Sequence, residues 1–175
     1  LVGMNCVNNT AVNQNLVLNL MAYIDYEEEQ PQFKIPEDSN IQWHNATDYT
    51  SNEPVRKSPQ YNLVYDGWNR NEMRTSQSLS GFVLGKGFGR DKGDKVNYEI
   101  NILPGKEKGM IGFRYNTPKG KTSTFQVKGI TESRLELQGT GEYNIVSIPY
   151  TCKEPGKYTL ELISEGTHST DLDGF

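Results

Sequence analysis

The stretch Lys95-Val-Asn-Tyr-Glu-Ile-Asn-Ile102 alternates apolar and polar residues without a break. From Val96 onward the apolar side chains recur at every second position, which places them on one face of an extended strand. Pro104-Gly105 begins a turn, and Met110–Tyr115 has the composition of a partner strand. This part of the chain therefore predicts paired β-strands with one face in a core.

Short strand-like segments follow one another from residue 61 to the end of the chain. Turn residues separate them at intervals of roughly 8 to 12 residues, which is typical of an all-β sandwich and excludes a parallel βαβ arrangement. We expect a β-sandwich domain over residues 61–175, and an irregular N-terminal extension or linker over residues 1–60. Besides the opening stretch, the expected strands are Asn62–Tyr65, Ser80–Leu84, Thr122–Val127, Arg134–Leu137, Tyr143–Ile148 (ending before Pro149), Tyr158–Ile163 and Asp171–Phe175.

Composition and charge exclude several classes of protein. The net charge of −4 is spread over both signs with no basic block, so we expect no nucleic-acid partner. No apolar run approaches the roughly 18 residues of a membrane span. The two cysteines, Cys6 and Cys152, are too far apart for a CxxC motif and are either separate thiols or one disulfide.

Catalytic motifs are not found in the sequence. His44 and His168 have no recognisable nucleophile beside them, and there is no GxSxG, HExxH or P-loop pattern. We therefore expect no enzymatic activity. A small hydrolase or lyase stays as an alternative, and it would need two carboxylates converging in one concave site.

Aromatic residues beside polar groups are candidates for contact with a saccharide, because a flat ring packs against a pyranose while polar groups bind its hydroxyls. Trp68 is flanked by Asp66 and Asn69, and Tyr143 is flanked by Glu142. The other aromatic candidates are Tyr98 and Trp43. For each ring the alternative is ordinary packing, and that alternative is strongest for Tyr98 because it shares the apolar face of its strand.

Asp171 and Asp173 lie two residues apart, and so on one face of a strand. Two carboxylates on one face repel each other unless a cation or solvent separates them. A calcium ion takes six to eight oxygen ligands, some of them backbone carbonyls. We therefore consider a structural calcium site that uses Asp173, with Glu72 as its upstream partner. The alternative is a solvated edge strand.

Three segments resemble carbohydrate-binding modules of families 6 and 35. They are GDKVNYEINILPGKEKGMIGFRY (residues 93–115), GTGEYNIVSI (139–148) and GKYTLELISEGTHSTDLDGF (156–175). In those modules the second segment carries a Thr-Gly-Gly-Trp strand entry, and the third ends in Asn-Ile-Asp. The resemblance covers about half of the chain and implies a galactose-binding-like jelly roll that binds polysaccharides or oligosaccharides.

The resemblance also implies roles for individual residues. Tyr143 falls where the family has its stacking Trp, Asp171 on the sugar-bonding Asn, and Asp173 on the structural calcium Asp. Lys95 falls where a second aromatic ring is common, so a cleft here would suit an acidic sugar with Lys95 as its charge partner. A lysine at position 95 is equally consistent with a structural domain that has no open cleft.

Two functions follow from the resemblance. The first is a non-catalytic carbohydrate-binding module, outside the cytoplasm (extracellular, cell-surface or periplasmic) and accessory to a neighbouring catalytic domain. The second is a structural or interaction domain of a larger glycoside hydrolase.

Overall fold

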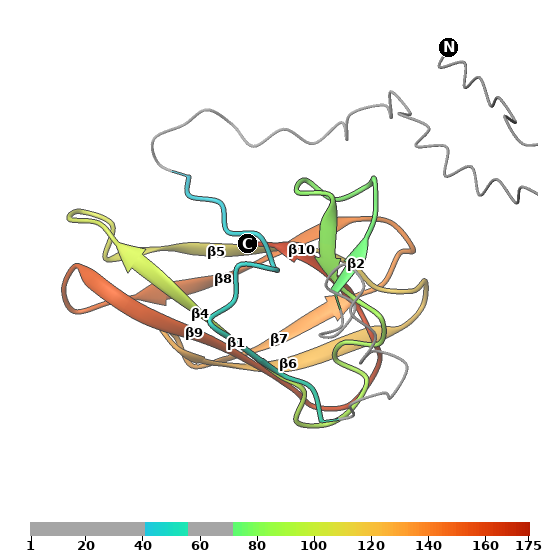
Figure 1. The fold of residues 1–175 in the computed structure, drawn as a ribbon. Helices are drawn as coiled ribbons and strands as arrows, with labels where there is room; N and C mark the ends of the chain where they lie inside the picture. The colour runs from blue at the N-terminus through green and yellow to red at the C-terminus, as the bar shows by residue number, and fades with distance from the viewer. Residues whose placement is uncertain (1–40, 56–71) are drawn as a thin grey trace, which may run out of the picture.

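The computed structural model describes residues 41–55 and 72–175, which form two five-stranded antiparallel sheets packed face to face, with no helix in these ranges (Figure 1). The all-β sandwich predicted from the sequence is therefore confirmed. In order, one sheet contains β1 (Ser51–Glu53), β4 (Lys95–Ile102), β9 (Gly156–Ser164), β6 (Thr122–Gly129) and β7 (Ser133–Gln138). The other contains β2 (Glu72–Arg74), β3 (Phe82–Leu84), β10 (Asp171–Gly174), β5 (Lys108–Asn116) and β8 (Asn144–Thr151).

The alternating stretch forms β4 with the predicted bounds, and its full length pairs with β9 in the same sheet. β5 lies in the opposite sheet, so the turn at Pro104-Gly105 connects the two layers. One predicted end was wrong, because β8 continues through Pro149 to Thr151. β8 is an edge strand, where a proline does not interrupt a hydrogen-bonded ladder. The strand expected at Asn62–Tyr65 lies outside the described residues.

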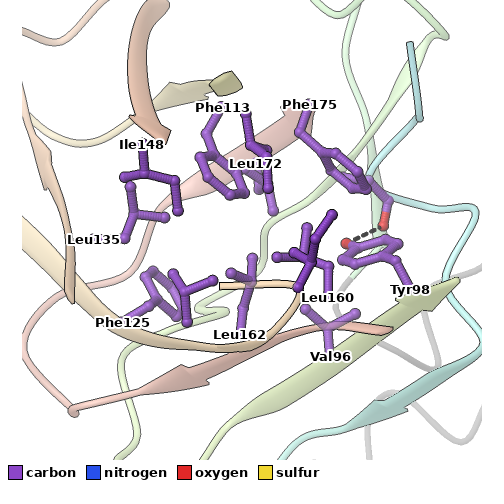
Figure 2. Close-up of a cluster of buried hydrophobic side chains, with 14 of the residues drawn as sticks. Val96, Tyr98, Phe113, Phe125, Leu135, Ile148, Leu160, Leu162, Leu172 and Phe175 are labelled. Carbon is purple, nitrogen blue, oxygen red and sulfur yellow. Dashed lines mark hydrogen bonds between the residues drawn. The ribbon is translucent and has the colours of Figure 1, made fainter. Parts of the chain in front are cut away.

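The core lies between the two sheets and takes the inward residues of both. Figure 2 shows Tyr98 pointing into this cluster beside Phe175. Its side chain is only 1% exposed, and its hydroxyl donates a hydrogen bond to the carbonyl of Ala46 at 2.8 Å. The prediction that Tyr98 contacts a saccharide is therefore wrong, because both faces of its ring are covered by the core.

Residues ahead of position 61 also contribute to the sandwich. His44 and Ala46 exchange backbone hydrogen bonds with Asp173 and Phe175, and β1 pairs with the start of β4. The boundary near residue 60 stays a prediction, as does any bond between the buried Cys152 and Cys6, which lies outside the described residues. No helix in the described part of the chain is long and apolar enough to cross a membrane.

Candidate functional site

The outer face of the sheet around β10 gathers five polar side chains from separate parts of the sequence. In β10, Leu172 points into the core, whereas the neighbouring aspartates point away from it. Arg114 comes from β5, Tyr143 comes from the loop before β8, and Thr75 comes from the turn after β2. We call this set the Tyr143 face, and it consists of Thr75, Arg114, Tyr143, Asp171 and Asp173.

A buried ion pair forms the base of the Tyr143 face. The Arg114 guanidinium donates to the Asp173 carboxylate, and the two side chains are 7% and 0% exposed. The same carboxylate accepts the backbone N–H of Leu79 at 3.1 Å, while Arg114 also donates to the carbonyl of Gln77 at 3.1 Å. Burial raises the pKa of Asp173, and the bonds from Arg114 and Leu79 oppose that shift. The pair therefore connects β10, β5 and the turn between β2 and β3.

Tyr143 covers this ion pair. The Cζ atom of Arg114 lies 4.2 Å from the centre of the Tyr143 ring, a favourable cation–π distance. The side chain of Thr75 lies near the Tyr143 hydroxyl and opposes the rise in the pKa of that hydroxyl. Burial, followed by the charges of Asp171 and Asp173, raises the pKa of Tyr143 well above its usual range. The ring is thus neutral and contacts the Arg114 guanidinium with its face.

Asp171 has a different environment from Asp173. Its carboxylate lies against Gly85, where a Cβ atom would overlap Asp171 Oδ1. Among the described residues, it has no hydrogen-bond or ion-pair partner, and burial raises its pKa. A partly buried carboxylate without a partner is destabilising, because desolvation is not offset by donors. Asp171 is therefore the carboxylate of the Tyr143 face that no donor among the described residues satisfies.

Asp171→Asn is expected to stabilise the protein at pH 7 by about 1 kcal/mol, the lower end of the cost of a buried polar group without a partner. A raised folded-state pKa means that the folded protein binds this proton more tightly than the unfolded chain does, so stability falls as pH rises through the folded pKa. The gain should vanish near pH 3, where the aspartate is protonated in both states. Urea unfolding at the two pH values measures this. Asp173→Asn should instead be destabilising at pH 7, although burial raises the pKa of Asp173 too, because it leaves the buried guanidinium of Arg114 without its carboxylate. A loss of stability for both variants at pH 7 would contradict this difference.

Lys95 and Glu72 are not part of the Tyr143 face. Lys95 lies on the outer side of the opposite sheet, where its amine is 3.1 Å from Glu53 and 3.9 Å from Glu161. Glu72 stands opposite Leu84, so it points to the inner side of its sheet, and it accepts a hydrogen bond from the hydroxyl of Tyr49. The prediction that Lys95 and Tyr143 share a cleft is therefore wrong. Trp68 lies outside the described residues.

The residues around Asp173 do not fit a calcium ion. Its carboxylate is already bonded to the guanidinium of Arg114, a cation that would repel a metal ion. Glu72, the predicted second ligand, faces the other side of the sheet. Residues 41–55 and 72–175 contain no group of three His, Cys, Asp or Glu side chains that could hold a metal ion. The predicted pairing of Asp173 with Glu72 around a calcium ion is therefore wrong.

An apolar cavity of about 330 Å³ lies at the side of the sandwich, between the end of β4 and the start of β5. Trp43, one of the predicted aromatic candidates, lines it and donates to its neighbour Asn45 at 2.8 Å. Arg114 is the only residue of the Tyr143 face that lines this cavity. Exposed apolar side chains around it are Ile41, Leu103, Met110 and Ile145. Polar side chains, among them Gln42, Asn101 and Lys106, also line it, so the cavity offers a mixed surface.

Sequence reasoning missed Arg114 and Thr75. Arg114 carries a signal in retrospect, since it is a charged residue at the outward position between two aromatic core residues of β5, Phe113 and Tyr115. A long charged side chain next to core positions must find a partner. Thr75 carries no such signal, because its role depends on a turn that only the folded chain brings beneath Tyr143.

No protein-family model and no curated protein matches this chain. Among solved structures, the carbohydrate-binding module CBM36 in complex with calcium and xylotriose is similar over 77% of this chain and 97% of that one, at 13% identity and a TM-score of 0.51. A family 6 carbohydrate-binding module is similar over 77% of this chain and 91% of that one, at 14% identity and a TM-score of 0.49.

A cycloisomaltooligosaccharide glucanotransferase from Paenibacillus sp. is similar over 78% of this chain, at 18% identity and a TM-score of 0.48, and the match spans only 18% of that enzyme. The similarity to CBM36, in contrast, covers nearly the whole of that module. The chain therefore has the β-sandwich fold of a carbohydrate-binding module, as its sequence resemblance predicted.

Proposed function

We propose that this domain is a non-catalytic module that binds a polysaccharide or oligosaccharide at the Tyr143 face. Asp171 accepts hydrogen bonds from sugar hydroxyls, and Tyr143 offers a ring whose position is fixed before the ligand arrives. We place the domain outside the cytoplasm, beside a catalytic domain that acts on the same glycan.

The observation that carries this proposal is the unpartnered carboxylate of Asp171, as seen among the described residues. Hydrogen bonds from neutral hydroxyls to a carboxylate are roughly twice as strong as those between neutral groups. A saccharide that supplies one or two such donors would offset the desolvation of Asp171. The unfavourable environment of the free site thus becomes a source of binding energy.

The charge balance favours neutral sugars. Arg114 is already neutralised by Asp173, and Lys95 lies on the other side of the sandwich, so the net charge of the Tyr143 face is that of Asp171. A uronic acid would be repelled by that charge. The acidic sugar that the sequence suggested with Lys95 as charge partner is therefore replaced by a neutral one.

A screen of neutral and acidic glycans, followed by titration calorimetry on the best binder, tests this function. Asp171→Ala is expected to weaken binding at least about tenfold, which corresponds to about 1.4 kcal/mol. Gly85→Ala should have a similar effect, because the added methyl group displaces the Asp171 carboxylate while the backbone of Gly85 has no left-handed φ.

Leu103→Ser is the matched control, since Leu103 is exposed beside the apolar cavity, in the segment between β4 and β5, and outside the Tyr143 face. It should bind as the wild type does. Failure of the folded wild type to bind any glycan would overturn the proposal, and so would equal affinity of Asp171→Ala and wild type.

The apolar cavity supports a second candidate function, a structural domain that packs against a neighbouring domain of a larger glycoside hydrolase. The exposed apolar side chains around the cavity are the supporting observation. Under this function, Leu103→Ser would weaken association with the neighbouring domain, whereas Asp171→Ala would not. The same pair of variants thus separates the two functions.

A further inference from the structure

Arg114 makes the contacts that a bound cation would make at this position. Its guanidinium collects one carboxylate oxygen, from Asp173, and one backbone carbonyl oxygen, from Gln77. Carboxylate and carbonyl oxygens are also the ligand types that calcium prefers. The difference is that the guanidinium is covalently part of β5 and carries its own positive charge at every physiological pH.

These contacts join the turn between β2 and β3 to β5 and β10. Residues 75–81 connect β2 to β3, and Thr75 and Gly81 close the turn with a backbone hydrogen bond of 3.0 Å. On its outer side the turn is held by Arg114 at the carbonyl of Gln77 and by Asp173 at the N–H of Leu79. Thr75, at the start of this turn, lies near the hydroxyl of Tyr143.

We infer that Arg114 is a built-in cation that positions the Thr75–Gly81 turn and Tyr143, so that the Tyr143 face is organised without a divalent metal ion. CBM36 is in complex with both calcium and xylotriose. In the present chain, Arg114 and Asp173 form an ion pair in which both side chains are almost completely buried. The inference deepens the proposed saccharide-binding function, but the organisation of the face can be tested without a saccharide.

The first test is thermal unfolding of the whole chain with EDTA or with calcium chloride, each at about 1 mM. A metal that binds only the folded state raises the melting temperature when its concentration exceeds its dissociation constant. We expect the wild type to melt at the same temperature in both solutions. A rise of several degrees with calcium would overturn the inference.

The second test is hydrogen exchange of the backbone amides in Arg114→Met. Loss of the guanidinium leaves a buried carboxylate unpaired, so the melting temperature should fall by roughly 10 to 20 °C. Protection should be lost first at Leu79 and its turn, while the strands of the opposite sheet keep theirs. Unchanged protection of the turn would contradict a positioning role.

Two further variants keep the test decisive where Arg114→Met folds poorly. Arg114→Met combined with Asp173→Asn removes both buried charges and should recover most of the melting temperature, but the turn should still exchange faster than in the wild type. Arg134→Met is the matched control, because Arg134 is 59% exposed and pairs with Glu136 and Glu165 on the surface. It should change neither quantity. Normal protection of the turn in the double variant would contradict the positioning role, because the turn would then keep its structure without the guanidinium.

The results also separate this inference from the proposed function. A wild type that binds no glycan, yet is indifferent to calcium and loses protection of the turn in Arg114→Met, would remove the function and leave the inference intact. A wild type that binds a glycan only when calcium is present would overturn the inference and leave the function intact.

Discussion

Phe113→Ala is expected to destabilise the protein by about 3 to 5 kcal/mol. Phe113 is completely buried on β5, and its ring centroid lies 6.0 Å from that of Phe175 at the end of the chain. Removing the ring leaves a cavity between the two sheets that neighbouring side chains can only partly fill, because both sheets are held by their ladders. Urea unfolding should show a lower midpoint with an unchanged slope.

Met110→Ala is the matched control for this loss. Met110 lies on the same strand, three residues earlier, but its side chain is 61% exposed. Its truncation should change the free energy of unfolding by no more than about 0.5 kcal/mol. Similar losses for the two variants would mean that β5 does not present Phe113 to the core in the register described.

The fold could be predicted because alternation along a strand is a local property. In β4 the buried residues recur from Val96 to Ile102, and the observed strand has the predicted bounds. Alternation says which side chains share a face, but it does not say which sheet a strand joins or which strand lies beside it. β4 and β5 are consecutive in the sequence and lie in opposite sheets, a fact that depends on contacts between distant residues.

The same limit explains the errors at the candidate site. Tyr98 was a candidate as an aromatic residue, although its place on the apolar face of β4 already favoured packing, and it is in the core. Lys95 was grouped with Tyr143 through the family resemblance, but its strand lies in the other sheet. Asp171 and Tyr143 do lie together on one face. Their grouping depends on β10 lying next to β5, which residue patterns alone do not predict.

Two glycines beside β6 differ in a way that the sequence alone does not predict. Lys119-Gly120 and Lys128-Gly129 are the same dipeptide, nine positions apart, and each lies at one end of β6. Both glycines have a positive φ, of 72° and 94°. A Cβ atom at Gly120 would meet no atom within 4 Å, whereas one at Gly129 would overlap the carbonyl of Thr159 on β9. Only the pairing of β6 with β9 distinguishes them.

Gly129→Ala is therefore expected to destabilise the protein by about 2 to 5 kcal/mol, which combines left-handed strain with overpacking. The Thr159 carbonyl cannot move away freely, because it accepts the N–H of Ile130 at 2.8 Å. Gly120→Ala carries the left-handed strain alone and should cost about 1 to 2 kcal/mol. Urea unfolding of both variants measures the difference, which isolates the close approach of β6 to β9. Equal losses would place β9 farther from Gly129 and contradict the strand order on which the sandwich, and with it the Tyr143 face, depends.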